Sequence, residues 1–252
     1  MASKRFKLNP DKTEFLRLTS RGRQHVIDPS SIVGHGLNIM PSFTVRLLGI
    51  YVDEAMSFEA HTGNVVRTCF FQLRQLKDIQ NCIAVDTAKT LINAFVFTML
   101  DYCNSLLAGV PSCQLDRLQS VFNAAARLVC RANRYDHITP LLRDALHWLR
   151  CRKRITFKLY VIVYKSLDNE APGYLQELCM PVNTNTRRST VRSVSDGQLI
   201  VPRTKTKPGE RAFSVAGPRT WNSVPVTVRQ FSSLSSCKRH LKAHLYNAPF
   251  PS

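Results

Sequence analysis

The chain has 252 residues, of which 44% are hydrophobic, and its 35 Lys and Arg exceed its 17 Asp and Glu by a formal net charge of +18. This length and apolar content allow a real core, which excludes wholly disordered and fibrous proteins. The charge excludes an acidic calcium-binding or mucin-like protein, and no apolar run reaches the ~18 residues of a membrane span.

The first 55 residues predict short strands and turns. The segments FLRL at 15–18 and VRLLGIYV at 45–52 are rich in residues that favour strands, and Pro29, Gly34, Gly36 and Pro41 between them are turn signals.

Helical periodicity then takes over. Apolar residues spaced three or four apart predict helices over about 65–76, 88–107, 115–129, 139–149 and 152–168. Asp86 is expected to cap the second helix and the segment 109–111 to end it. The apolar stripes are broad, which predicts helices that pack on one another.

The last 70 residues differ in composition. Residues 183–252 hold 12 Lys and Arg against 2 Asp and Glu, a net charge of +10, whereas residues 1–182 carry +8. The run NTNTRRSTVRSVSDGQ predicts a linker or exposed loop, LIVP at 199–202 a short strand, AFSVAGPRTWNSVP a segment punctuated by Gly and Pro, and 234–245 a short amphipathic helix. This charge density favours a nucleic acid over an anionic membrane, with a merely solubilising tail as the alternative.

The predicted fold is therefore mainly α. A helical bundle over 59–182 follows a small β-rich segment over 1–58 and precedes a basic, partly irregular region over 183–252 that ends in a short helix.

Eight cysteines are spaced at least ten residues apart, so no CxxC pair exists. The basic start MASKRFKLNP lacks the apolar segment of a secretory signal, which predicts an intracellular protein of the nucleus or cytoplasm, with reduced and mostly buried thiols. Cys69, Cys103 and Cys130 fall on apolar helical positions, which supports burial, and disulfides are the alternative.

Two short motifs look like sites and are interpreted otherwise. Tyr51-Val52-Asp53-Glu54 is close to the polymerase signature YxDD, but adjacent acids on a strand point to opposite faces and no second acidic strand precedes them. Cys237, His240 and His244 share one helical face, but a structural zinc needs a fourth ligand and none lies nearby. We interpret the first as a strand end and the second as a core thiol beside surface histidines. No phosphate-loop, dinucleotide, serine-hydrolase or zincin motif occurs.

Several long blocks, in order, resemble one family. They are LNPDKTEFL at 8–16, RLLGIYVDEAMSFEAH at 46–61, NAFVFTMLDYCNSLLAGVP at 93–111, LDRLQSVFNAAARLV at 115–129, HITPLLRDALHWL at 137–149, ERAFSVAGPRTWNSVP at 210–225 and FSSLSSCKRHLKAHL at 231–245. The chain resembles the C-terminal part of the reverse transcriptase, an RNA-directed DNA polymerase, of jockey-like non-LTR retrotransposons (LINE transposable elements).

The resemblance implies a role for particular residues. NPDKTEF is similar to motif D at the end of the polymerase palm, so Lys12 matches the family's general acid, against the plain alternative of a surface lysine in a turn. RLLGI is similar to the primer-grip strand, which implies that Leu48 and Gly49 lie near the primer terminus. YxDD precedes motif D in the family, whereas Tyr51–Glu54 follow it here, so this order also marks them as a decoy.

The helices from about 64 to 168 would then be the thumb, which grips duplex shape and phosphate. Its candidate phosphate contacts are Arg67, Arg74, Lys77, Arg117, Arg127, Arg131 and Arg134. The collective candidates of the basic region are Arg187, Arg188, Arg192, Arg203, Lys205, Lys207, Arg211, Arg219, Lys238, Arg239 and Lys242. Trp221 and Phe213 are candidates for stacking on bases, with core packing favoured over stacking.

Intact family members use Mg²⁺ held by palm carboxylates that lie upstream of motif D, and they carry an endonuclease. This chain is expected to lack both, to need no cofactor, and to bind RNA and DNA, as duplex or RNA–DNA hybrid, without catalysis and without a membrane. The alternatives are a repurposed helical protein that binds another protein and has no nucleic-acid role, and a zinc-dependent DNA-binding module.

Overall fold

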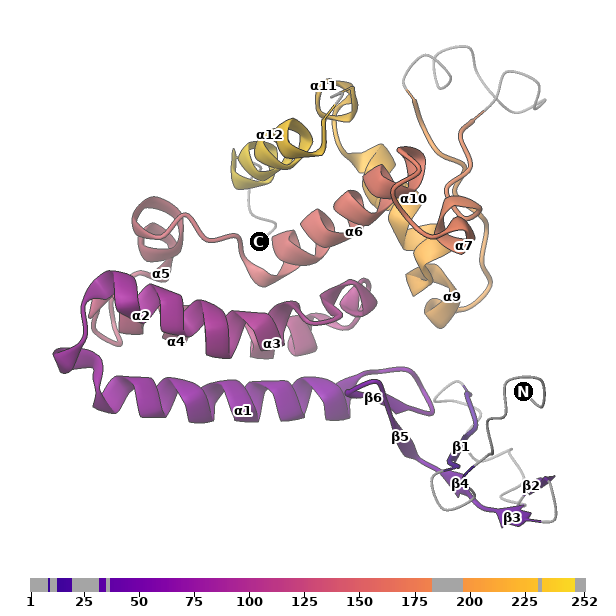
Figure 1. Cartoon of the computed structure of the whole chain (residues 1–252), viewed down its shortest axis with the longest axis horizontal. Helices are drawn as coiled ribbons and strands as arrows, with labels where there is room; N and C mark the ends of the chain where they lie inside the picture. The colour runs from indigo at the N-terminus through magenta and orange to yellow at the C-terminus, as the bar shows by residue number, and fades with distance from the viewer. Residues whose placement is uncertain are drawn as a thin grey trace. The chain divides into compact units, whose positions relative to one another are not determined.

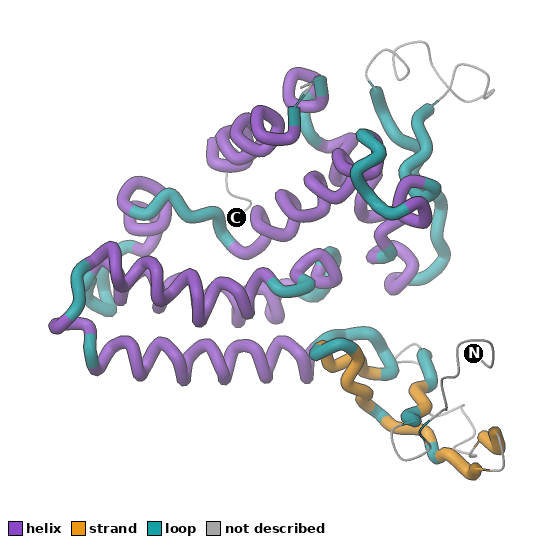
Figure 2. The backbone as a smooth tube through the Cα atoms, in the orientation of Figure 1, coloured by secondary structure: helices purple, strands orange, loops and turns teal. Residues whose placement is uncertain are grey.

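A computed structural model describes residues 9, 13–19, 32–34, 37–182, 197–230 and 233–247. The chain divides into two compact units, Met1–Val65 and Val66–Ser252, each described here by itself. Among the described residues, Figure 2 shows strands in the first unit and mostly helices in the second, so the prediction of a mainly α fold with a small β region before the helices is confirmed.

The described residues of the first unit form three pairs of short strands. β1 (Phe15–Leu16) pairs in parallel with β4 (Pro41–Ser42), β2 (Ile32–Gly34) pairs antiparallel with β3 (Leu37–Ile39), and β5 (Thr44–Leu47) pairs antiparallel with β6 (Ile50–Asp53). The segment 45–52 is thus a hairpin rather than one strand. Its turn is Leu48-Gly49, with φ of 49° and 85°, the two positive values of a type I′ turn that matches strand twist.

The second unit is built from helices in the order shown in Figure 1. The first half holds α1 (Glu59–Asp78), which begins in the first unit, η4 (Gln80–Cys82), α2 (Val85–Ile92), η5 (Asn93–Phe97), α3 (Thr98–Asp101), η6 (Asn104–Leu107) and α4 (Ser112–Cys130). The second half holds α5 (Ile138–Pro140), η7 (Leu141–Ala145), α6 (Cys151–Leu167), α7 (Gly173–Gln176), α9 (Lys207–Arg211), α10 (Phe213–Ser223), α11 (Val226–Arg229) and α12 (Leu234–Asn247).

Two predicted helices are shorter than expected. The helix predicted over 88–107 is interrupted after α3, because Cys103 takes a left-handed backbone with φ of 52°. The prediction that Asp86 caps this helix is wrong: Ala84 is the N-cap, and Asp86 lies in the first turn, where it pairs with Lys89 at 3.3 Å. The helix predicted over 139–149 ends at η7, since His147 is also left-handed, with φ of 52°.

The C-terminal region contributes more helix than its sequence predicts. The sequence predicts a segment punctuated by Gly217 and Pro218, but both residues lie inside α10, which packs along α6. A Cβ on Gly217 would come within 3.0 Å of the Val163 side chain, so glycine permits this close approach. Burial of Val215 and Trp221 offsets the backbone hydrogen bond that Pro218 cannot make. The strand predicted over 199–202 is reduced to one isolated bridge between Leu199 and Pro181.

One apolar cluster of the second unit joins residues from both sides of the 183–196 segment. Its buried members are Leu149, Tyr160, Val163, Tyr164, Cys179, Leu199, Trp221, Val224, Val228, Cys237, Leu241 and Leu245. The described part of the basic region therefore helps to form the core that α6 needs.

Candidate nucleic-acid interface

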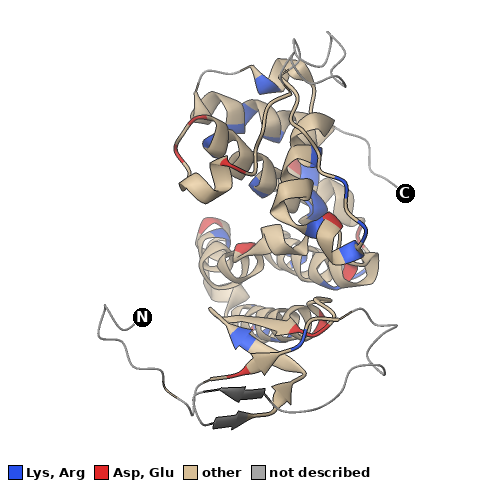
Figure 3. Cartoon of the chain, turned by 90° about the vertical axis from the view of Figure 1, so that its right-hand side faces the viewer, with Lys and Arg blue, Asp and Glu red and all other residues tan. Residues whose placement is uncertain are grey.

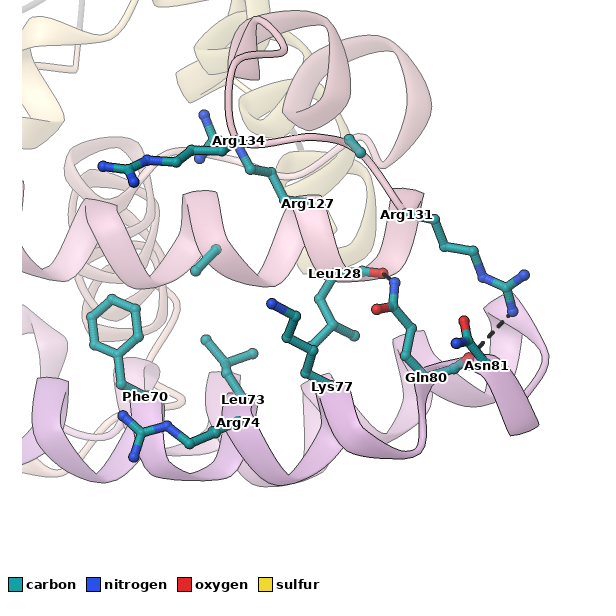
Figure 4. Close-up of a pocket in the computed structure, with 12 residues that line it drawn as sticks. Phe70, Leu73, Arg74, Lys77, Gln80, Asn81, Arg127, Leu128, Arg131 and Arg134 are labelled. Carbon is teal, nitrogen blue, oxygen red and sulfur yellow. Dashed lines mark hydrogen bonds between the residues drawn. The ribbon is translucent and has the colours of Figure 1, made fainter.

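A groove of about 630 Å³ lies between α1 and α4 in the second unit (Figure 4). Its wall on α1 carries Phe70, Leu73, Arg74 and Lys77. These residues share a face because positions three and four apart lie one above another on a helix.

The opposite wall follows the same rule on α4. Ala124, Arg127 and Leu128 lie on one face of that helix, Arg131 is its C-cap, and Ala132 and Arg134 follow. Leu73 and Leu128 are buried, so apolar side chains form the floor of the groove, and the longer basic side chains reach over it.

The groove is strongly basic. Arg74, Lys77, Arg127, Arg131 and Arg134 line it, and no Asp or Glu is among its lining residues. Arg74, Lys77 and Arg134 are exposed and make no hydrogen bond or ion pair with another described residue. Cations concentrated in a concave surface without counter-charges attract a polyanion.

The other two arginines have structural partners. Arg127 donates to the backbone carbonyl of Asp136 at 3.4 Å, while its buried Nε has no partner among the described residues. Arg131 donates to the carbonyls of Gln80 and Ile83, each at 3.2 Å. Only part of their hydrogen-bonding capacity therefore remains for a ligand.

Gln80 closes one end of the groove. Its amide donates to the carbonyl of Leu128 at 2.7 Å, and its own carbonyl accepts from Arg131 (Figure 4). These bonds satisfy a carbonyl of the last turn of α4 and tie the segment after α1 to that helix. The two walls are thus fixed before any ligand arrives.

Five of the seven basic residues that sequence analysis placed on the thumb-like helices meet in this groove. The other two do not: Arg67 lies earlier on α1, and Arg117 donates to Gln114 at 3.3 Å on α4. Sequence analysis named each of these cations within the thumb-like segment from about 64 to 168, but it carried no signal that positions 74–77 and 127–134 face one another.

The candidates of the basic region lie on several elements rather than in one groove, and Figure 3 shows Lys and Arg distributed over many helices. Arg203 and Lys205 precede α9, Lys207 and Arg211 lie on it, Arg219 is on α10, and Lys238, Arg239 and Lys242 are on α12. Lys242 also lines a smaller hollow of about 370 Å³ with Lys158 and Arg154. Lys12, Arg187, Arg188 and Arg192 lie outside the described residues.

The aromatic candidates of that region are core residues. Trp221 is only 4% exposed, stacks on Tyr160, and donates its indole N–H to the carbonyl of Gly197 at 2.9 Å. Phe213 packs against the same cluster. The alternative that Trp221 stacks on bases is therefore wrong.

The carboxylate of Asp53 accepts hydrogen bonds from the residues that follow it in the chain. It accepts from the backbone N–H groups of Ala55, Ser57 and Phe58 at 3.1, 2.8 and 2.7 Å, and from the Ser57 hydroxyl at 3.0 Å. The residue thus orders the turn between β6 and α1, which agrees with its interpretation as a strand end. Leu48 and Gly49 form the exposed hairpin turn of the first unit, with Leu48 82% exposed.

The zinc alternative gains no support in the described residues, where no three His, Cys, Asp or Glu side chains are grouped as metal ligands. Cys237 is fully buried in the core cluster. All eight cysteines are free thiols, as expected, but only Cys69, Cys151, Cys179 and Cys237 are buried. Desolvation raises the pKa of the Cys69 and Cys151 thiols to about 12, so both stay protonated and unreactive.

Among the described residues, no helix has both the length and the apolar character to cross a bilayer. Comparison with protein-family models, with curated proteins and with solved structures gives no match.

Proposed function

We propose that the chain derives from a LINE-type RNA-directed DNA polymerase, that it is not catalytic by itself, and that its helical unit binds RNA or DNA through the groove between α1 and α4. The observation that carries the binding proposal is the set of five cations on the two groove walls, with no acidic side chain among the lining residues. The polymerase origin rests on the sequence blocks that resemble the family.

The chemistry of the groove suits a phosphate backbone. Arg and Lys on opposite walls can meet successive phosphates, and each contact releases condensed counterions from the nucleic acid. Backbone contacts of this kind position a nucleic acid without reading its sequence. The proposed binding is therefore sequence-independent, and duplex or RNA–DNA hybrid is the form that the family resemblance implies.

The binding test uses the full chain and a triple variant, Arg74→Gln, Lys77→Gln and Arg134→Gln. Affinity for RNA and DNA oligonucleotides is measured against salt concentration. The slope of log affinity against log salt should become shallower by about 2 for single strands, from ~0.7 per lost phosphate contact, and by more for duplexes.

The matched control removes the same charge from α12 with Lys238→Gln, Arg239→Gln and Lys242→Gln. If this variant reduces the slope as much as the groove variant does, binding is spread over the surface and the groove proposal fails. An unmodified chain with a slope near zero would refute nucleic-acid binding and favour a protein-interaction role.

The absence of catalysis is tested separately by primer extension on an RNA template with Mg²⁺ or Mn²⁺. We expect no nucleotide incorporation, because phosphoryl transfer needs carboxylate-held metal ions as well as a positioned primer. Incorporation by the purified chain that persists after further purification would overturn the proposal.

A further inference from the structure

The groove has an apolar floor beneath its basic rim, and this floor restricts the kind of ligand more than the charge does. Leu73, Leu128 and the ring of Phe70 line it, and Ala124 and Ala132 leave the space open because their side chains are short. In Figure 4 the Phe70 ring extends from α1 toward α4 rather than away from the groove.

A duplex cannot contact this apolar floor. Its phosphates lie on the outside of a helix whose major groove alone is about 12 Å wide, and its bases are paired inside. Against the groove between α1 and α4, a duplex would touch the rim cations and leave the apolar floor uncovered. A cavity of about 630 Å³ is the size that encloses a small molecule, so it can take only a few nucleotides.

A single strand matches both parts of the groove. Its unpaired bases have apolar faces that stack on aromatic and aliphatic side chains, while its phosphates remain available to cations. The bonds from Gln80 to Leu128 and from Arg131 to Gln80 keep the walls in place, so little ordering of the protein opposes binding.

Building on the proposed function, we propose that the groove between α1 and α4 binds a short single-stranded stretch of RNA or DNA. The unpaired bases lie on the apolar floor of the groove around Phe70, and Arg74, Lys77 and Arg134 contact the phosphates.

The first test fills the groove without changing its charge. Ala124→Leu adds apolar volume at the floor of the groove, and Ala243→Leu makes the same change on an exposed position of α12 as a control. Affinities are measured for single-stranded RNA, single-stranded DNA and hairpin duplexes of about 12 nucleotides or base pairs. We expect Ala124→Leu to weaken single-strand binding roughly tenfold or more and to leave duplex binding unchanged.

The second test removes the aromatic ring but keeps an apolar side chain. Phe70→Leu should weaken single-strand binding roughly tenfold, because base stacking on the ring is lost. Circular dichroism and the urea midpoint establish that each variant is folded. Quenching of a fluorescent base analogue placed within the strand, lost in Phe70→Leu, reports the stacking directly.

The outcomes separate this inference from the proposed function. If the triple charge variant weakens binding but Ala124→Leu does not, the groove binds nucleic acid by its rim and the single-strand inference is wrong. If the charge variant has no effect either, the proposed function fails as well. Equal weakening of duplex and single strand by Ala124→Leu also overturns the inference, and the RNA and DNA arms show which sugar is preferred.

Discussion

The indole ring of Trp221 stacks on the phenol ring of Tyr160, with ring centroids 4.7 Å apart and an interplanar angle of 21°. The Tyr160 hydroxyl also donates to the backbone carbonyl of Val228 at 3.2 Å. One buried tyrosine of α6 thus holds both α10 and the α11 turn. The basic C-terminal region is not an independent tail in its described part, because its helices complete the core of the second unit.

Removal of the Trp221 ring should destabilise the whole second unit. We expect Trp221→Ala to reduce the free energy of unfolding by about 3–5 kcal/mol, since it leaves a large cavity beside Tyr160 and removes the ring stacking. Urea unfolding followed by circular dichroism measures this change. Tyr174→Ala, at a side chain that is 67% exposed, is the control and should change stability by less than about 0.5 kcal/mol. Equal effects of the two substitutions would contradict the described core.

The partly buried ion pair between Arg154 and Asp101 should be sensitive to loss of one charge. Arg154 lies over the rings of Phe97 and Phe122, with its guanidinium carbon 5.0 and 5.2 Å from their centroids. Asp101→Asn leaves this cation unpaired, and we expect a loss of about 1–2 kcal/mol, below the value for fully buried pairs because both side chains retain some solvent exposure. Glu170→Gln breaks the more exposed pair with Lys165 and should change stability by less than ~0.5 kcal/mol.

The stability of the protein should fall below neutral pH because of His61. Burial lowers the pKa of this imidazole from 6.5, so the folded state favours its neutral form. The loss therefore begins as pH drops below about 6.5 and ends at the lowered folded pKa, with a slope of at most ~1.4 kcal/mol per pH unit. His61→Gln should flatten the dependence between pH 7 and 5, whereas His137→Gln, at an exposed position, should not. An unchanged slope in His61→Gln would contradict this assignment.

Thiol reactivity should separate the cysteines into classes. Cys82 and Cys113 are exposed and should react first with a disulfide reagent in the native protein, while the four buried thiols should react only after unfolding. Mass spectrometry after limited reaction identifies the modified peptides. Early modification of Cys69 or Cys151 would show that the surrounding helices open much more readily than the buried packing implies.

Sequence reasoning predicts α1, α4, α6 and α12 well, because their apolar residues repeat at the helical period over many turns. It misses α10, since Gly217 and Pro218 are local breakers whose effect is outweighed by packing against Val163 and Tyr160. Interruptions at Cys103 and His147 are also missed, because a positive φ is uncommon for residues other than glycine and the apolar spacing gives no sign of it.

The candidate site was predictable only in part. The five groove cations all belong to the segment from about 64 to 168 that the family resemblance implies is the thumb, but their convergence depends on how α1 and α4 are spaced in three dimensions. No sequence pattern indicates a role for Ala124 and Ala132, although their small side chains leave the space at the floor of the groove. Of the residues predicted as candidates for stacking, Trp221 is a core residue, whereas Phe70, which lines the groove, is not among them.

The shared core of α6 and α12 constrains how the chain acquires its structure during synthesis. Tyr160 and Leu149 contact a cluster that includes Cys237, Leu241 and Leu245 near the end of the chain. At about 5–20 residues per second, the ribosome needs on the order of 4–15 s to extend the chain from α6 to the end of α12. Throughout that interval the α6 residues that pack against α12 have no partner, so the nascent chain should be a substrate for chaperones that hold exposed apolar surface.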